Sequence, residues 1–418
     1  MKKEKLAIFG GKKAINTDHP HWQWPPHSQE REDAIMDYMK YGKLNQKDYP
    51  EIVEEFEKNF AGYQKRKYAL TTNSGTSSLY AAFFAVGLDP GDEVLAPTLT
   101  FHATATPILQ NSAIPVLVDC EADTGNIDPV GIEKRITNKT KAVVITHLWG
   151  HPCEMGEILE IIREHSLLLI EDCSHAHGST YKGDKVGTFG DIACFSLANT
   201  KILAAGEAGV LVTDRKELFE RALLISDLGG RRLMHELTID ELKIYNETGF
   251  GHKHRIHPHA AVLANVELQN LHKYIKLRYD KLDYLSEGLK NIPGIKPPIT
   301  RKHVTRGAYF GYRPFYNKKE LNNLKITDFI KIMNAEGMEV RQSGNKPLHQ
   351  LPLFDNLKNE KVDFRNSEKF YNSSLSLPTF TFEDKRLIDE YISAFKKVCT
   401  FLSENVLDID NQDTISDK

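Results

Sequence analysis

Short apolar runs alternate with stretches of helical periodicity between about residues 67 and 214. Seven of the runs are expected to form strands: 68–71, 93–96, 114–118, 142–146, 167–170, 192–195 and 209–212. Apolar residues at helical spacing follow residues 74–76, and a second helix is expected over 155–165. The strand-like runs are almost continuously apolar, which is typical of strands covered on both faces. The alternation predicts an α/β fold with a mostly parallel central sheet flanked by helices.

The pattern changes beyond the expected sheet. Residues 258–289 have the apolar spacing of one long helix, and a cluster of prolines follows at Pro293, Pro297 and Pro298. We therefore expect an N-terminal arm (1–50), a large domain (51–290), a smaller C-terminal α+β domain (291–405) and a polar tail (406–418) that is disordered.

Composition narrows the class of protein. The 418 residues include 54 Lys and Arg against 57 Asp and Glu, so no basic excess favours nucleic acid as a partner. No run of about 18 apolar residues predicts a membrane span, and the first apolar stretch is too short for a secretory signal, so we expect a cytoplasmic protein. The five cysteines are scattered and contain no C-x-x-C pair, which argues against disulfides and a thiolate metal site. Small molecules and other copies of the chain are the expected partners.

Candidate catalytic side chains follow the ends of predicted strands: Ser74 to Ser77, Phe101, Asp172 and Ser196. Ligands of open α/β sheets bind at the carboxyl ends of the strands, so these residues are expected to form one site. Lys201 follows closely, before the turn Gly206-Glu207-Ala208-Gly209. A lysine for an imine and a carboxylate for a pyridinium nitrogen are the two groups that pyridoxal phosphate requires.

Each candidate also has an ordinary structural interpretation. The Ser74-Gly75-Thr76-Ser77 turn can bind phosphate at a helix start, or it can simply cap the helix. Asp172 can face a pyridinium N–H or cap the next turn, and Phe101 can stack on a planar ring or belong to the core. Lys201 can be a desolvated amine or a solvated surface lysine. The combination in this order favours the cofactor interpretation.

Two groups of histidines are candidate metal ligands. His252, His254, His257 and His259 lie within eight residues, and His147 and His151 are four residues apart. No cysteine or carboxylate joins them at the spacing of metal ligands, so we predict no metal. A phosphate-loop motif and a dinucleotide-binding G-x-G-x-x-G are absent from the sequence.

Several motifs together resemble the DegT/DnrJ/EryC1/StrS family of pyridoxal-phosphate sugar aminotransferases. The resemblance covers about residues 9–397 and rests on the following segments: 73–76, 91–94, 100–101, 144–150, 171–178, 195–196 with Lys201, and 206–209. It implies the aspartate-aminotransferase fold, known as fold type I.

The resemblance also implies roles for individual residues. Lys201 matches the Schiff-base lysine, Asp172 the partner of the pyridine nitrogen, and Phe101 the aromatic stacked on the ring. His175 matches a position near the ring oxygen of the cofactor. The phosphate contacts of the family match Gly75, Thr76, Ser77 and Ser196.

In that family a second subunit completes the site through a G-x-N-x-R segment, so a homodimer with shared active sites is implied. The corresponding stretch here is Gly251-His252-Lys253-His254-Arg255, in which Lys253 replaces the usual asparagine and Arg255 matches the arginine. An ammonium at this position could still bind phosphate.

The activity implied is transfer of an amino group from glutamate or glutamine to a ketosugar or keto-cyclitol, with pyridoxamine phosphate as the intermediate form of the cofactor. Segments 171–178 and 198–209 are most similar to the branch that includes glutamine:scyllo-inosose aminotransferases and 3-amino-5-hydroxybenzoate synthases. A sugar dehydratase or an aminohydroxybenzoate-type synthase is the alternative, although the known dehydratase variant has histidine in place of the lysine. A non-catalytic regulator is a second alternative, which the lack of a helix-turn-helix extension disfavours.

Overall fold

The computed structural model describes residues 5–42, 50–228, 231–307, 309–357, 362–380, 385–407 and 415–416. At its centre lies a seven-stranded sheet in the order β1-β9-β8-β5-β4-β2-β3. Its strands are β1 Tyr68–Thr72, β2 Glu93–Pro97, β3 Ile114–Val118, β4 Thr140–Thr146, β5 Leu168–Asp172, β8 Ile192–Ser196 and β9 Gly209–Thr213. Only β9 runs antiparallel to its neighbours in this sheet. All seven predicted strands are confirmed, as is the mostly parallel sheet.

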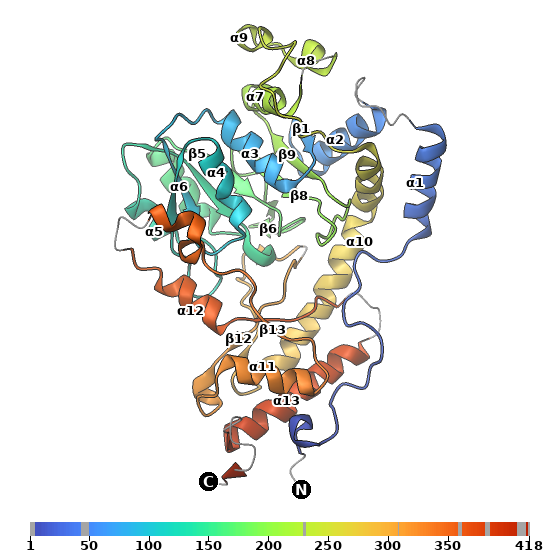
Figure 1. Cartoon of the computed structure of the whole chain (residues 1–418), viewed down its shortest axis with the longest axis vertical. Helices are drawn as coiled ribbons and strands as arrows, with labels where there is room; N and C mark the ends of the chain where they lie inside the picture. Colours follow the sequence, from blue (N-terminus) through green and yellow to red (C-terminus); the bar gives the residue numbers. More distant parts are fainter. Residues whose placement is uncertain are drawn as a thin grey trace.

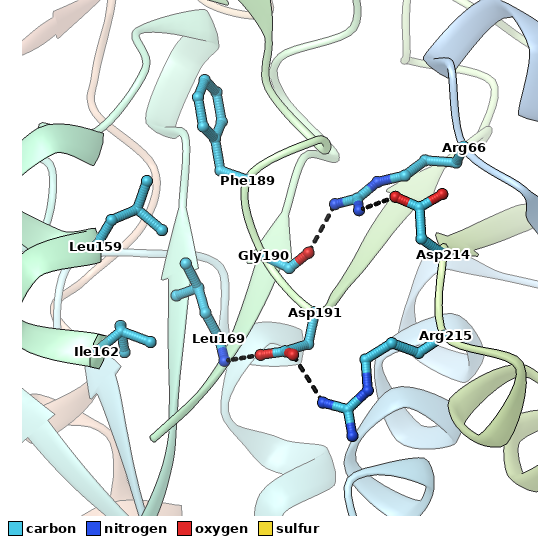
Figure 2. Close-up of a pocket in the computed structure, with 9 residues that line it drawn as sticks. All are labelled: Arg66, Leu159, Ile162, Leu169, Phe189, Gly190, Asp191, Asp214 and Arg215. Atoms are coloured by element: carbon cyan, nitrogen blue, oxygen red, sulfur yellow. Dashed lines mark hydrogen bonds and ion pairs between the residues drawn. The ribbon is translucent and has the colours of Figure 1, made fainter. Parts of the chain in front are cut away.

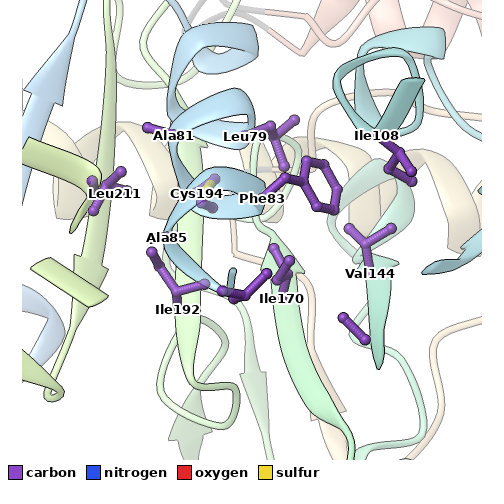
Figure 3. Close-up of a cluster of buried hydrophobic side chains, with 14 of the residues drawn as sticks. Leu79, Ala81, Phe83, Ala85, Ile108, Val144, Ile170, Ile192, Cys194 and Leu211 are labelled. Atoms are coloured by element: carbon purple, nitrogen blue, oxygen red, sulfur yellow. The ribbon is translucent and has the colours of Figure 1, made fainter. Parts of the chain in front are cut away.

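Helices cover both faces of this sheet. On one face, α3 (Gly75–Ala85) and α7 (Lys216–Ser226) pack on side chains such as Ile170, Ile192 and Leu211, and Figure 3 shows α3 lying across these strands. On the other face, the alternate side chains of the strands meet α2 (Glu51–Gln64), α6 (Met155–Glu164) and the first turns of α10 (Pro258–Leu289). Burial on both faces explains the almost continuous apolar runs of the strands.

Of the remaining described helices, α1 and α13 are the longest. The remaining helices are α1 Gln29–Tyr41, α4 Thr106–Gln110, α5 Pro129–Lys134, α8 Arg231–Glu236, α9 Asp240–Lys243, α11 Ile326–Ala335, α12 Arg365–Ser373 and α13 Arg386–Glu404. Short 3₁₀ helices span Ala7–Phe9, His102–Thr104, Leu148–Gly150, Lys318–Glu320, Leu348–Gln350 and Pro352–Leu357.

Short strands form four further small sheets. The strands are β6 Thr180–Tyr181, β7 Asp184–Lys185, β10 Ile295–Lys296, β11 Val304–Thr305, β12 Phe315–Tyr316, β13 Arg341–Gln342, β14 Leu375–Ser376, β15 Val406–Leu407 and β16 Ile415–Ser416. The sheet β11-β6-β7 joins a segment near residue 304 to the loop that follows β5.

A second core lies in the C-terminal part of the chain, below the sheet in Figure 1. The side chains of α11 and α13 pack there against the last turns of α10, which runs from one core to the other. Leu6 and Ile15 also belong to this second core. The side chain of Glu336 holds their segment in place, because its two oxygens accept from the Ala7 N–H at 2.8 Å and from the Ala14 N–H at 3.0 Å. Residues close to the start of the chain are therefore part of the C-terminal core.

The expected domain boundaries at 50, 290 and 405 stay predictions. Most of the predicted polar tail, residues 408–414 and 417–418, lies outside the described residues, whereas β15 and β16 pair with each other within it. Among the described helices, none is both long and apolar enough to cross a membrane.

Candidate active site

The candidate residues gather where the parallel strands end. Ser74 follows β1, Phe101 follows β2, Asp172 ends β5 and Ser196 ends β8. The carboxyl ends of parallel strands lie at one edge of the sheet, so the topology brings these residues to the same side.

Lys201 lies in a loop after β8 that its backbone holds in place. Its N–H donates to the carbonyl of Ala198 at 2.8 Å, and its own carbonyl accepts from Trp24 Nε1 at 2.7 Å. The Nζ lies 3.8 Å from the ring centroid of Phe310, and this ring stacks on His175 with the centroids 4.1 Å apart. Among the described residues, the Lys201 amine has no hydrogen-bond or ion-pair partner. The structure thus brings Lys201 and His175 together around Phe310.

Asp172 is a buried carboxylate with only 5% of its surface exposed. Oδ2 accepts from the Thr104 hydroxyl at 2.7 Å, and Oδ1 accepts from the Ser174 N–H at 3.1 Å. These are two neutral donors, so the carboxylate is oriented and its negative charge remains available to a cation.

The electrostatics of the site favour neutral bases. Burial lowers the pKa of Lys201 to about 8, although the negative charge of Asp172 acts in the opposite direction. Burial, together with the charges of Lys201 and Arg313, holds the pKa of His175 well below its ordinary value. Burial and Lys201 likewise lower the pKa of His177 to about 3. With this pKa, roughly a tenth of the Lys201 amine is neutral at pH 7, far more than for a lysine with the ordinary pKa, and the neutral amine is the form that acts as a nucleophile.

The start of α3 forms a turn suited to an anion. Ser74 caps the helix by accepting from the Ser77 N–H at 3.1 Å, and the Ser77 hydroxyl donates to Asn73 Oδ1 at 2.7 Å. A Cβ on Gly75 would lie 2.7 Å from Ser196 Cβ, so only glycine allows these segments to approach so closely. An open pocket of about 580 Å³ lies here and is lined by Ser74, Thr76, Ser77, Tyr80, Gln110, His252 and His254.

Phe101 lies at the same edge with 48% of its surface exposed, an unusual state for a large aromatic side chain. Its carbonyl accepts from the Thr104 N–H at 3.0 Å, and Thr104 in turn holds Asp172. One short turn therefore connects the exposed ring to the buried carboxylate.

The structure of one chain does not bring Lys253 and Arg255 to Lys201. Arg255 Nε lies 3.2 Å from Asp227 Oδ1, and Lys253 is exposed. The intervening His254 does reach the candidate phosphate turn, because its carbonyl accepts from the Asn73 N–H at 2.6 Å.

Glu171, which directly precedes Asp172 in β5, forms a buried pair with His147. Glu171 is fully buried and accepts from His147 Nε2 at 3.0 Å and from the N–H groups of Gly187, Phe189 and Gly190. His147 Nδ1 accepts from the Cys153 N–H at 3.0 Å. Glu171, His147 and Cys173 have their ligand atoms within 4.8 Å of one another, but the first two use those atoms in these hydrogen bonds. We therefore assign them a structural role.

Sequence reasoning missed four contacts of the site: those made by Trp24, Thr104, Trp149 and Phe310. Thr104 could have been found because it lies one turn beyond Phe101. Trp24 and Phe310 are more than 100 residues from Lys201, and no local pattern marks them.

A second pocket lies at the opposite edge of the sheet (Figure 2). Its charges are paired: Arg66 with Asp214 and Arg215 with Asp191, each at 2.8 Å. Asp191 also accepts from the Leu169 N–H at the start of β5. These contacts connect the amino-terminal ends of the strands and give this pocket a structural explanation.

The candidate site fits pyridoxal phosphate. It holds a buried carboxylate without a bonded cation, an amine with a lowered pKa, an exposed aromatic ring and a helix start beside an open pocket. Asp172 would hold the ring nitrogen, Lys201 the aldehyde carbon, and the 74–77 turn with Ser196 the phosphate.

Known proteins are similar to this chain in sequence and in fold. A family model for the DegT/DnrJ/EryC1/StrS aminotransferase family matches residues 26–394. A putative L-glutamine:3-amino-2,3-dideoxy-scyllo-inosose aminotransferase from Micromonospora echinospora is 32% identical, over 84% of this chain and 82% of its own. A GDP-perosamine synthase from Caulobacter vibrioides is 33% identical, over 83% of this chain and 90% of its own.

Among solved structures, an aminotransferase from Psychrobacter cryohalolentis superposes with a TM-score of 0.83 at 27% identity, over 92% of this chain and 100% of its own. The expected fold type I is confirmed by such neighbours and by the sheet. The chain belongs to the DegT/DnrJ/EryC1/StrS aminotransferase family.

Proposed function

We propose that this aminotransferase moves an amino group from glutamate or glutamine to a ketosugar or keto-cyclitol, as a step in amino-sugar or aminocyclitol biosynthesis. Family membership implies dependence on pyridoxal phosphate. The observation that carries the proposal is the placement of a low-pKa lysine and a buried carboxylate at the same sheet edge. The names of two relatives support the substrate class, since one acts with L-glutamine on an inosose and the other makes a GDP-linked amino sugar.

Pyridoxal phosphate, when bound, supplies an aldehyde for the amino group and a ring that stabilises negative charge at the reacting carbon. The side chains then have separate tasks. Asp172, oriented by Thr104 and Ser174, holds a proton on the ring nitrogen. Lys201 Nζ accepts the proton from the α carbon of the amino donor, which its lowered pKa favours.

Two further parts of the proposal concern the assembled protein and its location. We infer that two copies share their active sites, with Lys253 and Arg255 acting in the partner's phosphate site. The exposure of Lys253 supports this arrangement, because it leaves the side chain accessible to a second copy. A cytoplasmic location completes the proposal.

Covalent attachment of the cofactor tests the proposal. Protein incubated with pyridoxal phosphate is expected to gain an absorbance band in the visible or near-ultraviolet, and borohydride treatment should leave a reduced adduct that mass spectrometry locates on Lys201. Glutamate or glutamine should bleach the band and release 2-oxoglutarate or its amide.

Lys201→Ala should lose both the adduct and the bleaching. Lys185→Ala is the matched control, since this lysine also has a lowered pKa from burial but bonds to the Tyr63 carbonyl. An adduct on another lysine, or no band at all, contradicts the assignment.

A further inference from the structure

Arg313 is a guanidinium without an acidic partner in the described part of the chain. Its Nη1 donates to the Tyr312 carbonyl at 3.4 Å and to the Ser376 hydroxyl, and its buried Nε has no hydrogen-bond partner. Two other arginines of the same segment are satisfied. Arg301 contacts three carboxylates, and Arg306 donates to two carbonyls and a hydroxyl. Arg306 has neutral acceptors for its donors, whereas Arg313 combines the lack of a described acidic partner with a buried donor that has no acceptor.

A second cation lies beside it. Arg341 of β13 is paired in register with Ser376 of β14, and Ser376 is the residue whose hydroxyl meets Arg313. Burial and the charge of Arg341 lower the pKa of Arg313 to about 10. Two arginines and a hydroxyl, with no acid bonded to them among the described residues, form an arrangement suited to an oxyanion.

The Arg313 guanidinium is held in a fixed orientation. Its Cζ lies 5.5 Å from the ring centroid of Trp149. A Cβ on Gly311 would lie 3.1 Å from the same Cζ and 3.2 Å from the Trp149 ring, so backbone and indole both crowd the guanidinium. A guanidinium fixed in this way binds a planar carboxylate with little further loss of side-chain freedom.

Arg313 also borders the candidate active site. Trp149, on which it packs, brings its backbone N–H 3.5 Å from His175 Nδ1. His175 stacks on Phe310, and Phe310 lies under the Lys201 amine. The charges of both Lys201 and Arg313 lower the pKa of His175, so both cations lie near this ring.

We propose that Arg313, assisted by Arg341 and Ser376, binds the α-carboxylate of the amino donor. This inference rests on the proposed function, because it assigns a subsite of that same active site. Glutamate, glutamine and the keto acid product share the α-carboxylate, which lies next to the carbon that reacts at Lys201. Phosphate oxygens of a nucleotide-linked acceptor have similar chemistry, and the experiment distinguishes the two sources.

The test uses cofactor-loaded protein and the rate at which glutamate, glutamine and alanine bleach its absorbance band. Arg313→Met is expected to raise the half-saturating concentration of all three donors by roughly 10- to 100-fold, since each loses a charge-assisted hydrogen bond. Arg313→Lys should restore part of the affinity. Calorimetric binding of 2-oxoglutarate should weaken in parallel without any turnover.

Arg215→Met is the matched control, because Arg215 pairs with Asp191 at the opposite edge of the sheet and should change no donor constant. If Arg313→Met does not fold, Arg341→Met replaces it in the experiment, because Arg341 is exposed. This variant is expected to raise the half-saturating donor concentrations a few-fold.

Unchanged donor constants in folded, cofactor-loaded Arg313→Met overturn the inference. If Arg313→Met weakens the binding of glutamate alone, Arg313 binds the distal carboxylate of glutamate, and the inference is overturned as well. Weaker binding of UDP, GDP or dTDP with normal donor constants assigns the arginine to the acceptor and also overturns it. Wild-type protein that loads no cofactor is a failure of the proposed function instead.

Discussion

Lys201 lies in surroundings that favour its neutral form. Its loop is fixed by the Ala198 carbonyl and by Trp24 Nε1, and its amine lies over the Phe310 ring, with no bonded acid among the described residues. Burial of an ammonium without a bonded anion lowers its pKa. The negative charge of Asp172 raises the pKa of Lys201 and so makes the decrease smaller. The reactivity of this lysine should therefore depend on pH in a defined range.

We expect the rate at which Lys201 reacts with an aldehyde to rise with pH around a midpoint near 8, because only the neutral amine attacks. Asp172→Asn removes the charge that raises the pKa of Lys201, so the midpoint should move to lower pH. The measurement is the rate of borohydride-trapped modification of Lys201 by pyridoxal at several pH values. A midpoint near 10, or no change in Asp172→Asn, would show that burial and Asp172 do not act as described.

Strand β5 carries two carboxylates whose side chains point to opposite faces of the sheet, because successive side chains alternate. Asp172 faces the site through Thr104, whereas Glu171 binds His147 and the loop 187–190. The same loop gives its carbonyls at Gly187 and Gly190 to Arg66. One strand thus positions both the site and the loop behind it.

Glu171→Gln is expected to lower the free energy of unfolding by roughly 2–4 kcal/mol, because the amide nitrogen would face backbone N–H donors in a dry environment. Denaturation by urea measures this change. Glu217→Gln, in the exposed first turn of α7, is the control and should change stability by less than about 0.5 kcal/mol. Equal stability of the two variants would contradict the role assigned to Glu171.

At the scale of the whole molecule, α10 connects the two cores and α1 packs along it (Figure 1). Glu267 of α10 lies fully buried against α1, with Arg31 Nε 3.3 Å from its Oε1. Burial raises the pKa of Glu267 to about 7, although Arg31 lowers it in part. The contact between the arm and the long helix therefore contains a carboxyl group that titrates near neutrality.

This raised pKa makes stability depend on pH. The folded protein holds the Glu267 proton up to about pH 7, whereas the unfolded chain releases it near pH 4.5. The folded state binds more protons in that interval, so this group favours folding at low pH and the free energy of unfolding falls as pH rises from 4.5 to 7. Since one pKa unit corresponds to about 1.4 kcal/mol, the rise in pKa from 4.5 to about 7 limits the loss to about 3.5 kcal/mol.

Glu267→Gln should remove this dependence and melt at a higher temperature than the wild type at pH 8, with the difference vanishing near pH 4.5. Thermal unfolding followed by circular dichroism at several pH values measures the effect. A difference that is constant with pH would indicate that the Arg31 pair keeps Glu267 ionised throughout.

The sequence by itself determined the elements of the sheet and marked Asp172 and Lys201 as the candidate pair. Apolar runs of strand length and helical spacing are local properties, so the seven strands and α10 could be predicted, and the residues at strand ends were marked by turn chemistry. Asp172, Lys201 and the 74–77 turn belong to this class. Their assignment to a family rested on the order of several such local motifs.

Tertiary structure alone decided what surrounds them. Trp24 and Phe310 come from segments more than 100 residues from Lys201, and they contact it only in the folded chain. Arg313 is equally distant in sequence, yet its charge acts on the nearby His175. The lowered pKa of Lys201 and the buried Nε of Arg313, which has no partner among the described residues, likewise depend on burial, which no local pattern encodes. Local spacing determines which residues a strand or turn presents, whereas the folded chain determines which distant groups they meet and how much water remains.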